Sequence, residues 1–265
     1  DPAEYEDSFR RHYQKGIPPA DRLTPALRFG GKAAKPPVFN VIEGIMESSR
    51  LKEMAARYGV SIGEFFTALL LDVSREEMIS RGMRPRPIRI SIPINLRRFF
   101  ESATMRNFVL AVEPGIDPRL GDFSFEEIIQ KVHHFMRSEL DHRFIRRQIV
   151  RNIHGEKQLL IKIVPRGIKD MVLRRMYSRY GTRIFTLGFS NLARVDIPEQ
   201  MMPFVEEYQF IPPPHDNAIN ATSIAYKGRT SVVFASTIAD RSLEGRFFSR
   251  LRQMGAAVSI RTNRR

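Results

Sequence analysis

The chain has 265 residues, of which 42% are hydrophobic and 10% are aromatic, enough apolar material for a sizeable core in one large or two small domains. This composition excludes a disordered chain, no stretch has the apolar length of a membrane-spanning helix, and the polar N-terminus does not have the pattern of a signal peptide. The absence of cysteine excludes disulfides, thiolate metal sites and a cysteine nucleophile, while a net charge of +14 favours an anionic partner.

The first part of the chain is predicted to lead into the folded region. Residues 1–15 have a charged helical pattern, and residues 16–37 are rich in proline and glycine, which favours a linker. Gly30-Gly31-Lys32 lacks the spacing of a phosphate-binding loop and the serine or threonine that would follow it, so these residues are interpreted as part of the linker.

A strand over 38–42 and a helix over 48–58 are predicted next. Ser61 and Glu64 then form a capping box, and apolar residues recur after it at helical spacing. Isoleucine alternates with polar residues over 88–94, which predicts a strand. Because proline cannot donate to a ladder, Pro93 makes this an edge strand or one that ends there. A strand over 108–112 and a helix capped by Ser124 and Glu127 complete this part of the prediction.

The second half is basic and then β-rich. Residues 143–183 interleave arginine and lysine with aliphatic residues, which predicts two helices broken near Gly155. The later strands are predicted over 184–189, 205–210, 219–226, 230–238 and 257–260, with a hairpin at Lys227-Gly228-Arg229 and a helix capped by Ser242. This mixed order predicts the α/β or α+β class, with a mixed sheet and helices packed on one face.

Histidine is the first place to look for chemistry. The pair His133-His134 lies within a predicted helix, and Ser138 and Glu139 stand where a His-His-x-x-x-Asp-Gly motif needs aspartate and glycine. We therefore interpret it as a partly exposed structural pair. Neither a metal-ligand spacing nor a nucleophile elbow is present, so the sequence predicts no catalytic residue and no metal site in this chain.

Two polar segments stand beside apolar strands, over 93–108 and 186–195. Amides and hydroxyls in such places need partners, because burying them without a hydrogen bond is costly. They fit either local turn and cap chemistry or the polar wall of a ligand tunnel.

These two segments carry a resemblance to a known family. The stretch IPINLRRFFESATMRNF, the stretch FTLGFSNLARVDIPEQM and the ending EGRFFSRLRQMGAAVSI resemble, in this order, motifs of bacterial alcohol O-acetyltransferase-like proteins. Those proteins belong to the superfamily of chloramphenicol acetyltransferase and the condensation domains of peptide synthetases. YEDSFRRHY resembles the segment that precedes the C-terminal half in that family, and Ala193 replaces the family's usual glycine.

The resemblance implies a lobe with a chloramphenicol-acetyltransferase-like fold, facing a second lobe across a tunnel. The acyl donor, an acyl-CoA or the phosphopantetheine thioester of a carrier protein, would enter from one side and a hydroxyl or amine acceptor from the other. The catalytic histidine of the family precedes Asp1, so this chain alone is expected to be inactive. The residues implied at the tunnel are Asn107, Ser190, Asn191, Ser102 and Thr104, while Arg97 and Arg106 would hold the backbone or contact phosphate.

The expected organisation is therefore a helix and linker belonging to a missing N-terminal lobe over 1–37, followed by the C-terminal acyltransferase-like lobe over 38–265. The expected partners are that N-terminal lobe and either acyl-CoA or an acidic carrier protein, with a homo-oligomer as a further expectation and the cytoplasm as the location. The alternative is a non-catalytic module that binds anionic membrane or nucleic acid through residues 143–183.

Overall fold

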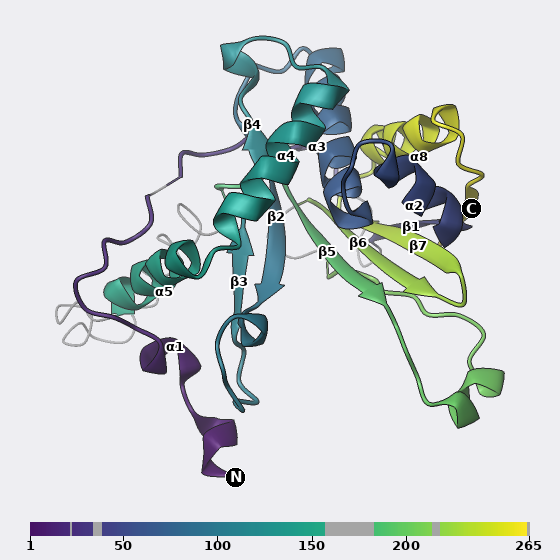
Figure 1. The fold of residues 1–265 in the computed structure, drawn as a ribbon. Coiled ribbons are helices and arrows are strands. Elements are labelled where there is room, and N and C mark those ends of the chain that lie inside the picture. The colour runs from purple at the N-terminus through teal and green to yellow at the C-terminus, as the bar shows by residue number, and fades with distance from the viewer. Residues whose placement is uncertain (22, 34–38, 157–182, 214–217, 264–265) are drawn as a thin grey trace.

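The computed structural model describes residues 1–265 except 22, 34–38, 157–182, 214–217 and 264–265 (Figure 1). Its helices are α1 Ser8–Arg11, α2 Ser48–Ala56, α3 Ile62–Ser80, α4 Phe125–Glu139, α5 His142–Glu156 and α8 Ser242–Gln253. Short 3-10 turns lie at Pro2–Tyr5, Leu96–Arg98, Pro118–Leu120 and Glu199–Phe204. Among the described residues, no helix is both long enough and apolar enough to cross a lipid bilayer.

One mixed sheet organises the molecule. Its strands are β1 Asn40–Glu47, β2 Ile88–Asn95, β3 Val109–Val112, β4 Gly115–Ile116, β5 Leu187–Arg194, β6 Ile219–Tyr226, β7 Arg229–Ser236 and β8 Ser259–Thr262. They lie in the order β3-β2-β5-β6-β7-β1-β8, with β4 paired to β2. β5 runs parallel to both β2 and β6, and the other pairs are antiparallel.

The main core lies between one face of this sheet and the helices α2, α3 and α8, with α4 packed on α3 (Figure 1). α3 begins at the expected capping box and is buried along most of its length. Phe66 on α3, Phe189 on β5 and Phe247 on α8 form edge-to-face and tilted ring contacts across this core. The predicted fold class, a mixed α/β sheet with helices on one face, is confirmed.

A second, smaller cluster joins the N-terminal segment to the lobe. Ile145, Ile149 and Ile153 on α5 pack with Leu96, Phe100, Phe108 and Leu110, and Phe9 and Tyr13 cover them. Residues 1–15 were expected to be one helix, but the structure shows a 3-10 turn and one short helical turn. The single side chains of Phe9 and Tyr13 pack into the cluster and hold this segment, so it needs no continuous helical face.

β2 and β5 share only a short ladder. Their register pairs Ile90 with Leu187 and Ser91 with Gly188, although each strand has eight residues. Beyond these pairs the two strands diverge, each still bound to its other neighbour (Figure 1). Pro93, which cannot donate a backbone hydrogen bond, lies in the part of β2 that β5 no longer pairs. In this half of β2, the described pairing is to β3 alone. The half is therefore a strand edge, as Pro93 led us to expect.

Two local predictions are wrong. Residues 205–210 were expected to form a strand, but they carry no regular structure and lie against β6. There the Phe210 carbonyl accepts a hydrogen bond from Thr222, and Tyr208 packs edge-to-face on Tyr226. Ser242 was expected to cap α8, but it is the first helical residue, and Asp240 accepts its N–H at 2.9 Å.

Candidate functional site

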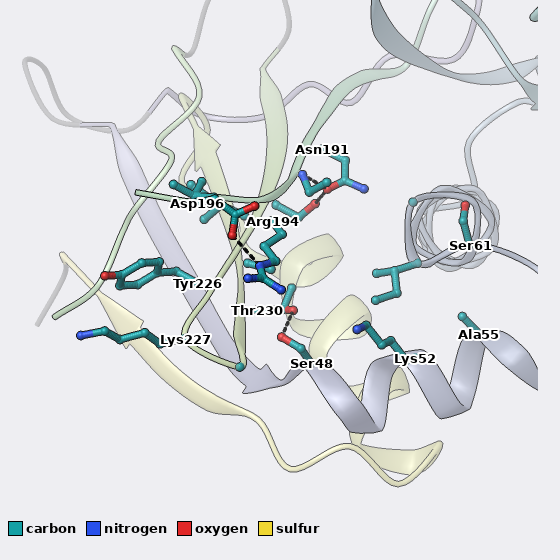
Figure 2. Close-up of a pocket in the computed structure, with 18 of the residues that line it drawn as sticks. Ser48, Lys52, Ala55, Ser61, Asn191, Arg194, Asp196, Tyr226, Lys227 and Thr230 are labelled. Atoms are coloured by element: carbon teal, nitrogen blue, oxygen red, sulfur yellow. Dashed lines mark hydrogen bonds and ion pairs between the residues drawn. The ribbon is translucent and has the colours of Figure 1, made fainter. Parts of the chain in front are cut away.

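A cavity of about 960 Å³ opens where three parts of the chain meet. α2 and the first turn of α3 line one side, the second half of β5 and the segment after it line another, and the β6–β7 hairpin lines the third. Figure 2 shows Lys52 and Ser61 on the helical side, facing Asn191 and Arg194 across the hollow. A concave site of this size fits a small organic ligand or an extended flexible chain.

The cavity forms because β5 leaves its regular ladder. The register between β5 and β6 shifts between Asn191 and Arg194. Within the shift, Ala193 has a φ of 55°, a left-handed conformation that glycine adopts more easily than alanine. The Oδ1 of Asn191 accepts the N–H of Ala193 at 2.9 Å, which stabilises the turn. The turn therefore forms with alanine at position 193, where the family that this sequence resembles usually has glycine.

The first turn of α3 presents backbone donors to the cavity. Ser61 Oγ accepts the N–H of Glu64 at 3.2 Å, and the Glu64 carboxylate accepts the N–H of Ser61 at 2.8 Å. The N–H groups of Ile62 and Gly63, at the cavity wall, find no acceptor among the described residues. With the positive end of the helix dipole, they favour a carbonyl or an anion in the cavity.

Glu64 holds this first turn in place. Its carboxylate also contacts His133 Nδ1 on α4 at 3.0 Å. Burial raises the pKa of Glu64, but the hydrogen bonds from Ser61 and His133 outweigh burial and hold the pKa below its usual value. His133 therefore ties α4 to α3, in agreement with a structural role for the histidine pair.

Asn191 is the polar side chain aimed most directly at this helix end. Its Oδ1 accepts hydrogen bonds from Ser223 Oγ and from the N–H of Ala193, each at 2.9 Å. Its amide nitrogen points toward α3, where a side chain on Gly63 would place Cβ only 2.9 Å from it (Figure 2). Glycine at position 63 thus permits the approach. With Oδ1 occupied, the Nδ2 group offers its N–H donors to the cavity.

Charged side chains around the cavity differ in how firmly they are held. Arg194 pairs with Asp196 at 2.7 Å, and Lys227 donates to the carbonyls of Met202 and Val205, both at 2.9 Å. Lys52 on α2 is exposed and has no ion-pair partner among the described residues. Lys52 is therefore the cation best placed to meet an anionic group at the cavity mouth.

The structure separates the residues that the sequence grouped together. Adjacent residues of a strand point to opposite faces, so Ser190 lines a different, smaller cavity of about 300 Å³ beside Pro212 and Asn220. Asn191 alone of the five implied tunnel residues lines the larger cavity. Four other lining residues were not named as site residues from the sequence, because nothing local in the sequence relates positions near 60 to positions near 190 and 220. These residues are Lys52, Ser61, Gly63 and Ser223.

The loop after β2 holds the other expected residues. Ser102 Oγ hydrogen-bonds Ser8 Oγ at 2.6 Å, and Thr104 Oγ1 donates to the Glu6 carbonyl at 2.6 Å, so both bind the N-terminal segment. Arg97 donates to the carbonyls of Thr104 at 2.6 Å and Arg106 at 2.7 Å.

The hydrogen bonds of Arg97 show that its guanidinium holds the backbone of the loop after β2. Asn107 is exposed in the same loop and does not line either cavity near β5. Within the described part of the chain, no three His, Cys, Asp or Glu side chains gather as metal ligands would. The roles of Asn107, Ser102, Thr104, Ser190 and Arg106 toward a substrate stay predictions.

The described part of the basic segment, residues 143–156, is engaged within the molecule. The apolar face of α5 packs into the second cluster instead of facing outward. Arg146 lies over the Phe100 ring, and Arg147 and Arg151 donate to the carbonyls of Pro19 and Asp21. These contacts do not favour a membrane-facing helix, and residues 157–182 lie outside the described residues.

No protein-family model matches the sequence, and no curated protein matches it. Solved structures do match. A nonribosomal peptide synthetase, FmoA3, aligns with a TM-score of 0.54 and 16% identity over 93% of this chain and 25% of its own. A chain of the complex of the X-domain and OxyB from teicoplanin biosynthesis aligns with a TM-score of 0.51 and 13% identity, over 93% of this chain and 50% of its own.

A third structure has the same arrangement. The epimerization domain from the third module of tyrocidine synthetase B aligns with a TM-score of 0.50 and 10% identity, over 96% of this chain and 56% of its own. The chain thus spans a quarter to just over half of these solved chains. Identities this low show the fold alone. The chain shares the fold of these neighbours, a mixed sheet covered by helices.

Proposed function

We propose that this chain is the C-terminal lobe of a thioester-dependent acyltransferase. It would serve a protein that moves an acyl group from acyl-CoA, or from a carrier-bound phosphopantetheine thioester, to a hydroxyl or amine acceptor. The observation that carries the proposal is the cavity in which Asn191 Nδ2 faces the first turn of α3. The ordered sequence motifs and the condensation-domain-like fold support it.

The donors around this cavity suit a pantetheine thioester. Pantetheine is a narrow, flexible chain with two amides, and its carbonyl oxygens need N–H partners when they leave water. Asn191 Nδ2 and the N–H groups of Ile62 and Gly63 supply such partners on one wall. Lys52 at the mouth suits the phosphate that adjoins pantetheine in both CoA and a carrier protein.

The chemistry requires a base, which the proposal places outside this chain. In acyl transfer, the base removes the proton of the acceptor O–H or N–H, and the acceptor atom attacks the thioester carbonyl carbon. The C–S bond then breaks, and the thiolate leaves and takes up the proton. The negative charge that develops on the carbonyl oxygen needs a hydrogen-bond donor. The proposal assigns to this lobe the binding and orientation of the donor, with the histidine of the resembling family in a second lobe.

A second lobe also accounts for an exposed apolar segment. The segment after β5 projects away from the body of the molecule (Figure 1). Phe204 at its end is 86% exposed, and Met201 beside it is 51% exposed. Apolar side chains gathered in this way mark a surface that another protein part covers. We propose that the N-terminal lobe covers this surface. We also propose the cytoplasm as the location of the protein.

The test uses a pantetheine ketone, in which a methylene group replaces the thioester sulfur, because it represents both donors and cannot react. The full-length protein that contains these residues is titrated with it by calorimetry, followed by hydrogen exchange of the amides near Lys52, Gly63 and Asn191. We expect saturable binding with protection of these amides. The proposal is contradicted if the pantetheine ketone and the corresponding CoA ketone both fail to bind, or if they protect amides elsewhere.

A further inference from the structure

A third cavity, of about 700 Å³, lies at the opposite end of the central strands. Its lining includes the four arginines Arg28, Arg84, Arg86 and Arg183, together with Leu27 and Met83. Arg84 and Arg86 immediately precede β2, and Arg183 precedes β5. Because β2 and β5 are parallel, both approaches reach the same end of the sheet, whereas Asn191 and its cavity lie near the other end of β5.

Backbone hydrogen bonds hold the three arginine-bearing segments together. The N–H of Leu27 donates to the carbonyl of Pro87, and the N–H of Ala26 donates to the carbonyl of Arg183, each at 2.7 Å. The extended segment 25–28 therefore bridges the entry to β2 and the entry to β5. Ala26 and Leu27 are buried at this point, which fixes the backbone from which Arg28 projects.

The cavity has a strong positive bias. Among the described residues that line it, none is aspartate or glutamate. Arg84, Arg86 and Arg183 are exposed, and none of the ion pairs between described residues involves any of them. The guanidinium groups of Arg84, Arg86 and Arg183 around one hollow repel one another, and this repulsion is relieved by an anion placed among them. The planar, forked guanidinium matches the oxygen atoms of phosphate.

We propose that this cavity is a binding site for a small molecule that carries two or more phosphate groups. The four arginines from three segments surround a ligand with several negative charges, and Leu27 and Met83 offer an apolar wall to the part without phosphate. The hollow shape favours a compact ligand over the long backbone of a nucleic acid. The site is separate from the proposed thioester cavity and does not depend on acyl transfer.

The test is calorimetric titration with inorganic triphosphate, and then with ATP, at low salt. We expect both to bind and the affinity to fall steeply as salt rises. Arg84→Gln/Arg86→Gln should weaken triphosphate binding by about tenfold or more, because each substitution removes a charge-assisted contact. The control Arg137→Gln/Arg252→Gln removes the same charge from exposed helical positions outside this cavity and should leave the affinity within about threefold of the parent.

Three outcomes would overturn the proposal. One is equal weakening in both double variants, which would indicate only the net charge of the protein. Another is a single-stranded oligonucleotide that binds through the same arginines more tightly than triphosphate or ATP, which would indicate nucleic acid. The last is absence of triphosphate binding to the parent protein. If the first variant is unfolded by circular dichroism, Arg183→Gln replaces it, with a smaller expected loss that still exceeds the loss in its control, Arg137→Gln alone.

Discussion

The hydroxyl of Ser223 on β6 donates a hydrogen bond of 2.9 Å to Oδ1 of Asn191 on β5. Ser223 is buried, whereas Asn191 is exposed at the cavity, so a fixed group in the sheet orients a group that faces the ligand space. The same oxygen accepts the N–H of Ala193, which sets the amide plane from both sides. The Nδ2 group is thereby directed at the first turn of α3.

Asn191→Ala removes that donor. We expect the affinity for the pantetheine ketone to fall by about tenfold, because one hydrogen bond inside the cavity is lost. Ser223→Ala leaves Asn191 anchored by Ala193 alone and should weaken binding less. Calorimetry measures both, and Asn152→Ala, at an exposed position of α5 outside this cavity, is the matched control. Unchanged affinity in Asn191→Ala, or an equal loss in the control, would reject the assignment.

Gly63→Ala tests the close approach between Asn191 and α3. A Cβ at position 63 would lie 2.9 Å from Asn191 Nδ2, so the amide must move. Alanine is a better helix former than glycine, and we expect the free energy of unfolding in urea to hold or to rise by up to about 1 kcal/mol while ligand affinity falls. Gly245→Ala, on α8 with open space around its Cβ, should match the stability effect without changing affinity.

Ala193→Gly tests the strain in the turn after Asn191. Left-handed backbone costs alanine about 1–2 kcal/mol, and glycine avoids this cost but loses more chain entropy on folding. The expected net result is a gain of up to about 1 kcal/mol in the free energy of unfolding by urea denaturation. Ala225→Gly, in the paired part of β6, should lose stability instead. Equal losses at both positions would show that the φ of Ala193 carries no strain.

Glu244 predicts a pH dependence of stability. It is 1% exposed on α8, and neither carboxylate oxygen accepts a hydrogen bond from another described residue. Its pKa is raised from 4.5 to about 7, mainly by burial and also by the negative charges of Asp240 and Glu77, while a hydrogen bond from its own backbone N–H and the charge of Arg241 oppose the rise. Between these two pKa values the folded protein binds more protons than the unfolded chain, so the free energy of unfolding falls as pH rises.

Glu244→Gln removes this titration. We expect the variant to be more stable than the parent at pH 8, with the difference shrinking as pH falls through 7 toward 4.5. Urea denaturation at a series of pH values measures it. Glu101→Gln, at an exposed carboxyl, is the control and should follow the parent. A stability difference that does not change with pH would contradict the buried, protonated state of Glu244.

Elements with a strong local pattern were predicted from the sequence. The two capping boxes, at Ser61 and Ser124, start helices where expected because each satisfies its own backbone donors. The β6–β7 hairpin turns at Lys227 and Gly228, both with positive φ, as its short glycine-containing turn indicated. The prediction of a strand over 205–210 was wrong, because apolar alternation does not reveal whether the edge of a neighbouring strand is available for pairing.

From the amino-acid sequence we could predict the periodicities, the caps, the basic charge, the fold class and the polar residues around position 190. Which of those residues share a site depends on the tertiary structure. It placed Ser190 and Asn191 on opposite faces, brought Gly63 to Asn191, and joined Arg28, Arg84, Arg86 and Arg183 around one hollow. The physical reason is that repeats and caps depend on neighbours within a few residues, whereas these contacts depend on how the whole chain buries its apolar faces.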